Sequence, residues 1–343
     1  MKAGYSNRLK HLTFKGIFLI FFVFLISILF YLNESLAQEI KKQNNIDAPT
    51  AVVVDSQTGK ILYGKNPHIK LPPASTVKLV TAMVALEKLD PEERVTISKN
   101  AAKTQSVSPK LMEGEVYRVR DLIYLALMRS VNSAAVALAE ATAGSEKNFV
   151  KLMNEKVQKI GAKDTKFVNA SGLPGSGQYT TVYDLTKIMS HAIAYPLIKE
   201  AVHTRIYLVR SEDGKEHFIQ NTNQLLWEED NMIGGKTGYT RKAKHCFVSA
   251  YKINGRLVYT AILGDTNRER LWKDTQQLIE RAEYVLAGKE EPVVKLSEEK
   301  PVMPVSYKKS QKLNKKNMVD KKKLRKNSKN KRIIYAKNNK KTI

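Results

Sequence analysis

The sequence is almost devoid of cysteine: Cys246 is the only thiol among 343 residues. A single thiol cannot form an internal disulfide, so the fold must be held by its core alone. Cys246 lies in a strand-like apolar run, and we expect it to be a small buried hydrophobe. Histidine is also scarce. Five of the six histidines follow the N-terminal region without metal-ligand spacing, which predicts no metal and no cofactor: His68, His191, His203, His217 and His245.

The sequence also lacks an apolar run of comfortable membrane-spanning length. Residues 17–32 are apolar apart from Ser27 and the hydroxyl of Tyr31, whereas a helix that spans a bilayer needs about 20 residues. Basic residues precede this run, and Ser35-Leu36-Ala37 gives it a small-x-small end. This pattern predicts a secretory signal over residues 1–37 and export to the periplasm or the outer face of the cytoplasmic membrane. Whether the segment is cleaved or retained as an anchor is left open.

The body of the chain lacks the positive excess that the formal charge of +25 suggests. Residues 301–343 alone carry sixteen Lys or Arg against one acid, Asp320, and four more bases precede the first apolar run. We therefore expect no nucleic-acid partner. Residues 289–343 have too few apolar side chains to bury, which predicts a disordered Lys-rich tail that contacts anionic lipid or wall polymer.

Apolar periodicity predicts the order of the secondary structure. Two runs at 51–55 and 60–63 form a hairpin, helical periodicity runs over 75–89, and three helical stretches follow between 120 and 160. Another helix covers 184–194 and ends near Pro196. Four β-like segments come next, and a closing amphipathic helix covers 270–286. The fold class is α/β: an antiparallel sheet covered by helices, with a mainly helical insertion between Ser75 and Ala194.

Three short motifs carry the chemistry. They are, in chain order, Ser75-Thr76-Val77-Lys78, Ser130-Val131-Asn132 and Lys236-Thr237-Gly238. Each is weak alone, since Ser-x-x-Lys recurs at Ser249, Ser297, Ser306 and Ser328. Their order and their positions at a helix start, an interhelical turn and a strand indicate acyl transfer through a serine ester.

Ser75 and Lys78 share one face of a helix, so the hydroxyl and the amine can form a hydrogen bond. A lysine acts as a base only when it is neutral, which requires burial or a second positive charge nearby. Lys236 is the candidate for that charge. The backbone N–H groups of Ser75 and Tyr239 are candidates for an oxyanion hole.

The other motif residues fit the remaining steps. Ser130 can pass a proton to the leaving amine, and Asn132 can position the substrate amide and Lys78. Lys236 and Thr237 can bind a terminal carboxylate, while Gly238 leaves room for substrate against the strand.

With these motifs in place, the chain resembles the serine D-alanyl-D-alanine carboxypeptidases, the low-molecular-mass penicillin-binding proteins. The resemblance runs from about residue 49 to 288 and extends to further strings: Pro73-Ala74-Ser75-Thr76-Val77-Lys78, Asp121-Leu122-Ile123-Tyr124-Leu125-Ala126-Leu127, Ser130-Val131-Asn132-Ser133-Ala134-Ala135, Phe167-Val168-Asn169-Ala170-Ser171-Gly172-Leu173-Pro174 and Gly235-Lys236-Thr237-Gly238-Tyr239-Thr240.

The resemblance implies a penicillin-recognising fold and a catalytic domain over 50–288, joined to the signal by a connector at 38–49. It also implies that Ser75 is the nucleophile and Lys78 the general base, with Ser130 as the third catalytic residue. The predicted substrate-binding residues are Asn132, Lys236, Thr237, Gly238 and Tyr239. The expected reaction removes the last D-alanine of a peptidoglycan stem peptide, and β-lactams are the expected covalent inhibitors.

Two departures concern the substrate carboxylate. Some relatives carry an arginine before the Lys-Thr-Gly strand, where this chain has Thr222. Others carry one after the last strand, where Arg268 and Arg270 are both candidates.

The sequence leaves three alternatives to the carboxypeptidase function. A D,D-endopeptidase or transpeptidase would use the same acylation step. A β-lactamase is disfavoured because residues 161–179 lack the Glu-x-x-Leu-Asn pattern that class A enzymes use for deacylation. The last alternative is a basic envelope-binding protein with an incidental site.

Overall fold

A computed structural model describes residues 24, 27–28, 30–31 and 46–296. The chain divides into two units, residues 1–46 and 47–343. In the first unit the described residues 24, 27–28 and 30–31 are helical. Within the described residues, no helix combines the length and the apolar character needed to cross a bilayer. The predicted signal cleavage point at Ala37 and most of the Lys-rich tail lie outside the described residues.

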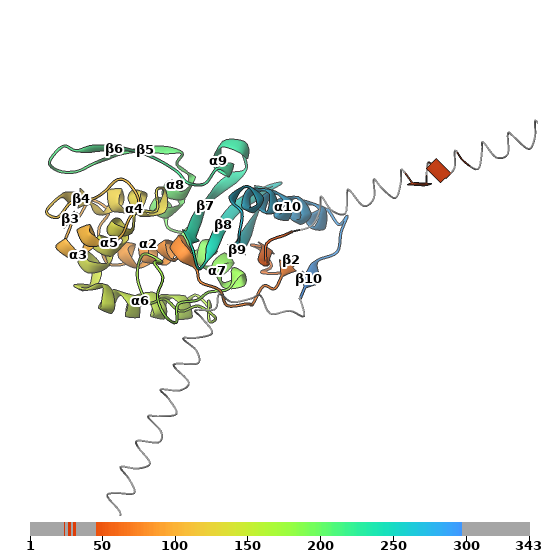
Figure 1. Cartoon of the computed structure of the whole chain (residues 1–343), viewed down its shortest axis with the longest axis horizontal. Helices are drawn as coiled ribbons and strands as arrows, with labels where there is room; N and C mark the ends of the chain where they lie inside the picture. Colours follow the sequence, from red (N-terminus) through yellow and green to blue (C-terminus); the bar gives the residue numbers. More distant parts are fainter. Residues whose placement is uncertain (1–23, 25–26, 29, 32–45, 297–343) are drawn as a thin grey trace, which may run out of the picture. The chain divides into compact units, whose positions relative to one another are not determined.

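The second unit is built on one six-stranded sheet, visible in Figure 1, with the strand order β10-β2-β1-β9-β8-β7. All neighbouring pairs are antiparallel except β10 and β2. The strands of this sheet are β1 (Thr50–Asp55), β2 (Ile61–Lys65), β7 (Met232–Thr240), β8 (Lys244–Ile253), β9 (Arg256–Asp265) and β10 (Val293–Lys295). The predicted antiparallel sheet is thereby confirmed, and β7, which carries the third motif, lies at its edge.

Helices cover both faces of the sheet. Every residue of β1 is buried, and α7 (Val182–Ala192) and α10 (Arg268–Leu286) each pack against β1, β8 and β9. The turn between β8 and β9 is the predicted Asn254-Gly255 pair, and both residues have positive φ, 47° and 84°. These angles are those of the two-residue turn that matches the twist of a hairpin.

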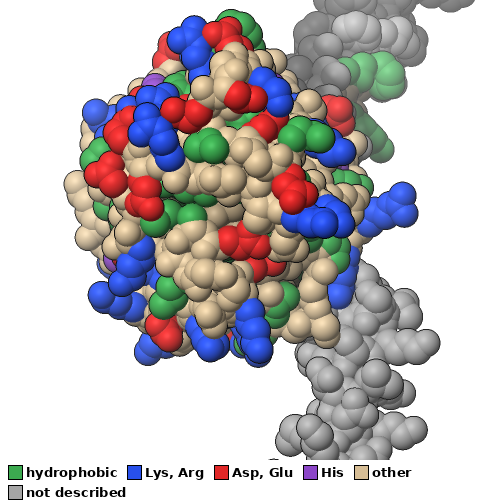
Figure 2. All heavy atoms as spheres, turned by 90° about the vertical axis from the view of Figure 1, so that its left-hand side faces the viewer, with side chains coloured by type: hydrophobic (Ala, Val, Ile, Leu, Met, Phe, Trp, Pro, Cys, Tyr) green, Lys and Arg blue, Asp and Glu red, His purple; other side chains and the backbone are tan. Residues whose placement is uncertain are grey.

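The insertion between β2 and β7 is mainly helical, as predicted for Ser75 to Ala194, and it continues beyond Ala194 as far as β7. Its elements are η1 (Ala74–Val77), α2 (Lys78–Leu86), β3 (Arg94–Thr96), α3 (Lys99–Lys103), β4 (Val116–Arg118), α4 (Val119–Leu127), α5 (Asn132–Ala143), α6 (Glu146–Lys159), α7, α8 (Pro196–His203), β5 (Ile206–Arg210), β6 (Glu216–Gln220) and α9 (Leu225–Glu228). On the face shown in Figure 2, basic and acidic side chains are interspersed.

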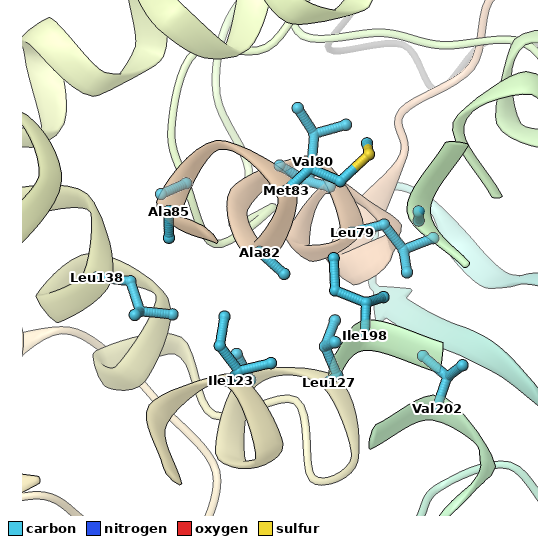
Figure 3. Packing of buried hydrophobic residues seen from close by; sticks show 14 of the residues in the cluster. Leu79, Val80, Ala82, Met83, Ala85, Ile123, Leu127, Leu138, Ile198 and Val202 are labelled. Atoms are coloured by element: carbon cyan, nitrogen blue, oxygen red, sulfur yellow. The ribbon is translucent and has the colours of Figure 1, made fainter. Parts of the chain in front are cut away.

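Helix α2 is the centre of this insertion. All its residues from Lys78 to Ala85 are buried, because α4, α5, α6, α7 and α8 surround it. Figure 3 shows Leu79, Ala82 and Met83 of α2 among the side chains of neighbouring helices. A helix that is apolar all round is held by such packing on every side. The first residue of α2, Lys78, is thus fixed within a close-packed core.

Several sequence predictions need correction. The helix expected from Ser75 begins as a 3-10 turn. The helix expected over 184–194 ends before Pro196, as predicted, but Pro196 then starts a further helix, α8, because a proline is well suited to the first turn of a helix. The strands at 205–209 and 217–220 form a separate two-stranded sheet, β5 and β6, and β3 and β4 were not predicted. The segment expected to be disordered from residue 289 first forms β10, because its backbone pairs with the edge of β2.

Candidate active site

Ser75 lies in the 3-10 turn η1, directly before α2. The preceding residue, Ala74, has a positive φ of 49°, which a residue with a Cβ rarely adopts. Gly172 lies against this strained backbone: a Cβ at Gly172 would fall 1.9 Å from the carbonyl oxygen of Ala74. The close approach of these two segments fixes the position of Ser75 at the mouth of α2, and strain of this kind is typical of functional sites.

The amine of Lys78 is directed at Ser75, as predicted from their i, i+3 spacing. Lys78 Nζ lies 2.9 Å from Ser75 Oγ, 2.6 Å from Asn132 Oδ1 and 2.5 Å from the carbonyl oxygen of Ser171. A neutral amine has two N–H bonds and one lone pair. Because the two carbonyl-type oxygens accept both N–H bonds, the lone pair of a neutral Lys78 is left to accept the proton of Ser75.

The surroundings of Lys78 favour that neutral form. Burial lowers the pKa of Lys78 well below its usual value, and the positive charge of Lys236 lowers it further. Lys236 is also fully buried, and burial lowers its pKa to about 7. Desolvation disfavours the charged form of an amine, and two such amines disfavour each other's charge. The predicted neighbour relationship between the two lysines is therefore present in the structure.

Ser130 lies on the turn between α4 and α5, as predicted, whereas Asn132, predicted on the same turn, is the first residue of α5. Ser130 has a positive φ of 65°, a second strained residue in this site. Asn132 begins α5, and its backbone N–H donates to Ser106 Oγ at 2.8 Å while its Nδ2 donates to the carbonyl oxygen of Gln105 at 2.7 Å. These bonds orient the amide of Asn132 so that its oxygen accepts from Lys78.

Strand β7 brings the third motif against the nucleophile. A Cβ at Gly238 would lie 2.8 Å from the backbone nitrogen of Ser75, so glycine is required for this approach. Tyr239 follows, and this residue is 55% exposed. An edge strand leaves part of its backbone unpaired, and the pairing of the N–H groups of Ser75 and Tyr239 with an oxyanion remains a prediction.

Lys236 lies on β7, where the sequence predicted a strand. Its side chain is fully buried, and Nζ donates to the carbonyl oxygen of Thr237 at 2.8 Å. Lys236 does not line the cavity beside Ser75, whereas Thr237 does. The predicted role of Lys236 in binding a substrate carboxylate stays a prediction, and its charge lowers the pKa of Lys78.

A cavity of about 350 Å³ opens in front of Ser75. Among the described residues, its lining contains no Asp or Glu: Ser75, Val107, Arg129, Ser130, Asn132, Thr222, Thr237, Gly238, Tyr239, His245, Cys246, Arg268, Leu271 and Trp272. Cys246 is fully buried, as predicted, and burial raises the pKa of its thiol to about 12.

The structure shows which of the residues discussed for the substrate carboxylate lie at the cavity. Thr222 Oγ1 lies 2.6 Å from Thr237 Oγ1, so the two hydroxyls form one polar edge of the cavity. Arg268 lines the cavity, while the guanidinium of Arg270 donates to Asp265 from Nη2 at 2.7 Å. Of these two arginines, Arg268 is therefore the one available to a ligand in the cavity.

Sequence reasoning missed three contributions to this site. The carbonyl oxygen of Ser171 contacts Lys78, Gly172 supports Ala74, and Arg129 lines the cavity beside Ser130. Ser171 and Gly172 belong to a string that already supported the family resemblance, so a signal for them existed. Arg129 carried no such signal, because its position depends on the backbone turn at Ser130.

Comparisons with known proteins identify the family that this chain resembles. A D-alanyl-D-alanine carboxypeptidase family model, Peptidase S11, matches residues 37–267. The chain is 34% identical over 238 residues to D-alanyl-D-alanine carboxypeptidase DacF of Bacillus subtilis, covering 68% of this chain but only 61% of that protein. It is 32% identical over 281 residues to a D-alanyl-D-alanine endopeptidase of Escherichia coli, covering 80% of this chain and 87% of that one.

Solved structures agree in fold. The D-alanyl-D-alanine carboxypeptidase of Mycobacterium tuberculosis H37Rv has a TM-score of 0.65 and 32% identity, covering 68% of this chain and 90% of that one. The Streptomyces K15 DD-transpeptidase has a TM-score of 0.65 and 29% identity, covering 69% and 97%. The fold is therefore the penicillin-recognising fold, and the chain belongs to the family of serine D-alanyl-D-alanine carboxypeptidases.

Proposed function

We propose that this protein is a serine D,D-carboxypeptidase that removes the terminal D-alanine from peptidoglycan stem pentapeptides through an acyl-enzyme. The contact between Lys78 Nζ and Ser75 Oγ carries the proposal, because it pairs a nucleophile with a base whose pKa is lowered. A hydroxyl paired with a positioned base is the arrangement of an activated nucleophile.

The reaction proceeds in two displacements. Ser75 Oγ attacks the carbonyl carbon of the bond between two D-alanines, and its proton passes to Lys78 Nζ. The oxyanion is stabilised by the N–H groups of Ser75 and Tyr239. The C–N bond then breaks as the leaving amine receives a proton through Ser130. Water hydrolyses the ester and returns the hydroxyl to Ser75.

The cavity lining argues against efficient β-lactam hydrolysis. No carboxylate among the described residues lines the cavity beside Ser75, so none is positioned there to activate a deacylating water. A β-lactam should therefore acylate Ser75 and leave slowly. Rapid turnover of penicillin would favour the β-lactamase alternative instead.

The test uses labelling and product analysis together. A fluorescent penicillin should label the protein, and mass spectrometry should locate the adduct on the peptide that contains Ser75. Ser75→Ala should lose both labelling and D-alanine release, whereas Ser176→Ala, an exposed serine outside the site, should retain them. Labelling that survives Ser75→Ala would contradict the proposal.

We also propose that the protein acts outside the cytoplasm, on the basis of the signal pattern in residues 1–37. N-terminal sequencing of the protein from a cell envelope fraction distinguishes cleavage after Ala37 from retention of the segment. Detection of the full chain in the cytoplasm alone would contradict export.

The Lys-rich tail is proposed to hold the enzyme to anionic lipid or wall polymer. The support is its charge in the sequence, at on the order of 1 kcal/mol per well-placed base on a membrane surface. Release of the protein from envelopes by high salt would support this role. If truncation of the tail abolished activity on a soluble peptide, a binding protein with an incidental site would be the better description.

A further inference from the structure

His245 lines the catalytic cavity, although the proposed reaction gives it no role. It is the second residue of β8 and is partly buried. In the pairing of β7 with β8 it lies opposite Tyr239, and the centroids of the two rings are 4.5 Å apart. The imidazole is therefore held beside the residue whose N–H is the second predicted oxyanion donor.

The lining of this cavity is cationic. Arg129 and Arg268 are exposed residues of the lining, and no Asp or Glu of the described chain belongs to it. Arg268 is the first residue of α10 and is the arginine placed to meet a carboxylate in the cavity. A ligand that carries a carboxylate therefore meets favourable charge here, and a further positive charge on the cavity wall adds to its affinity.

The charge state of His245 is set by its neighbours. The charged side chains that act on it are Lys244 on the same strand, Asp265 opposite it on β9, and Arg268 and Glu269 at the start of α10. The carboxylate of Asp265 is already paired with Arg270. Burial lowers the pKa of His245 below its usual value of 6.5, and the charge of Arg268 lowers it further. The imidazole of the free enzyme is therefore mainly neutral at pH 7 and gains its charge at lower pH.

A carboxylate bound at Arg268 changes this balance. Its negative charge offsets that of Arg268 and attracts the imidazolium, so binding raises the pKa of His245. Coupling between two binding events is reciprocal, so protonation of His245 must strengthen the binding of the carboxylate by the same factor. The affinity for an anionic ligand therefore increases as the pH falls through the pKa of His245, whereas an uncharged ligand gains nothing.

We propose that His245 is a specificity-determining residue of this site, and that its protonated form strengthens the binding of substrates and β-lactams through their carboxylate. The inference rests on the proposed function, and it assigns binding rather than bond-making to the imidazole. It also predicts that low pH has two opposite effects. Binding of an anionic ligand improves, while the chemical step slows because Lys78 loses its neutral form.

The test compares benzylpenicillin with its methyl ester, which has the same β-lactam ring but no carboxylate charge. The second-order rate constant of acylation is measured for both compounds with the full-length protein between pH 5 and pH 8. Lys78 acts on the same bond in both compounds, so the acid-to-ester ratio reports the contribution of the carboxylate. This ratio should rise about three- to tenfold from pH 8 to pH 5, the size expected of one added charge in a partly exposed site.

Two variants isolate the histidine. His245→Gln keeps a polar side chain that does not titrate, and it should lose most of the rise while leaving the ratio at pH 8 close to that of the parent. His191→Gln is the matched control, because His191 is an exposed residue of α7 outside the cavity lining and burial also lowers its pKa. It should show the rise of the parent. Lys236, with a pKa of about 7, is present in all three proteins, so its contribution does not distinguish them.

A second measurement needs no substitution at His245. Ser75→Ala retains the cavity but cannot be acylated, and NMR titration of its histidine Cε1–H signals gives the pKa of His245. A peptide that ends in D-Ala-D-Ala should raise this pKa by about 0.5 to 1, which is the same three- to tenfold factor on the pH scale. The C-terminal amide of the peptide should leave the pKa unchanged.

The outcomes separate the two proposals. If the parent is acylated by neither β-lactam and releases no D-alanine, the proposed function is wrong. If acylation is intact but the acid-to-ester ratio does not change with pH, or rises equally in His245→Gln, the role of His245 alone is overturned. A pKa of His245 that does not respond to the peptide acid would overturn it as well.

Discussion

Lys78 Nζ lies 2.9 Å from Ser75 Oγ, and its two other contacts are oxygens of Asn132 and Ser171. A guanidinium cannot become the neutral base that this arrangement requires. We therefore expect Lys78→Arg to lower the rate constant for acylation by penicillin by about 10²- to 10⁴-fold. Lys88→Arg, exposed just beyond the end of the same helix, should acylate at the parent rate. Stopped-flow acylation measures both, and a small loss in Lys78→Arg would assign the base to another group.

The pH dependence of acylation should depend on Lys236. The charge of Lys236 lowers the pKa of Lys78, which acts only when it is neutral. The acylation rate should therefore fall as the pH falls through the pKa of Lys78, which gives the pH profile an acid limb. Lys236→Met removes the neighbouring charge and should move this acid limb to higher pH. The limb is read from the acylation rate constant between pH 5 and pH 10. A limb that does not move would mean that the two amines are not electrostatically coupled.

The same substitution should stabilise the fold near neutral pH. The pKa of Lys236 is lowered from 10.5 to about 7 in the folded state, so the unfolded chain binds more protons between these values. The stability of the parent should rise with pH across this window. Lys236→Met should raise the free energy of unfolding at pH 7 by on the order of 1 to 4 kcal/mol, and the gain should shrink toward pH 10.5. Denaturant unfolding checks this, with the exposed Lys252→Met as control.

Gly172 and Gly177 form a matched pair for testing the support of the nucleophile. Both have positive φ, 82° for Gly172 and 83° for Gly177. A Cβ at Gly172 would lie 1.9 Å from the carbonyl oxygen of Ala74, whereas a Cβ at Gly177 would point into open space. Gly177→Ala should cost about 1 kcal/mol from backbone conformation alone. Gly172→Ala should cost more and also slow acylation, because Ser75 must shift. Equal losses in stability and unchanged acylation would show that the contact does not position Ser75.

Arg268 and Arg270 should have opposite roles despite their proximity in sequence. Arg268 lines the catalytic cavity, whereas Arg270 pairs with the buried Asp265. Arg268→Gln should raise KM for a peptide with a free terminal carboxylate about 5- to 100-fold and leave the melting temperature unchanged. Arg270→Gln should lower the melting temperature, because it leaves a buried carboxylate without its ionic partner. Steady-state kinetics compares a peptide that has a free terminal carboxylate with the same peptide as a C-terminal amide. Together with thermal unfolding, these measurements distinguish the role of Arg268 from that of Arg270.

Local sequence signals predicted much of this architecture. The i, i+3 spacing of Ser75 and Lys78 fixed their contact, and the Asn254-Gly255 pair fixed the β8–β9 turn. Both features depend on residues close together in the chain. For the same reason, the turn that carries Ser130 could be placed between two helices from periodicity alone.

Features that depend on distant segments could not be predicted in this way. The positive φ of Ala74 is held by Gly172, almost a hundred residues later, and the burial of Lys236 depends on the strands and helices around β7. The distinction between Arg268 and Arg270 depends on which side of α10 faces Asp265. Strand β10 pairs with β2 across most of the chain length, and its three residues, Val293-Val294-Lys295, are too short a run to indicate that pairing.

Strand β10 determines where the described chain ends relative to the catalytic edge. It lies at one border of the six-stranded sheet, and β7 lies at the other. Five strand spacings separate them, about 24 Å across the sheet. A fluorescent protein or surface tether fused after Leu296 would therefore start from the opposite border and leave the entrance to the nucleophile open, which makes this the preferred attachment point for imaging or immobilising an active enzyme.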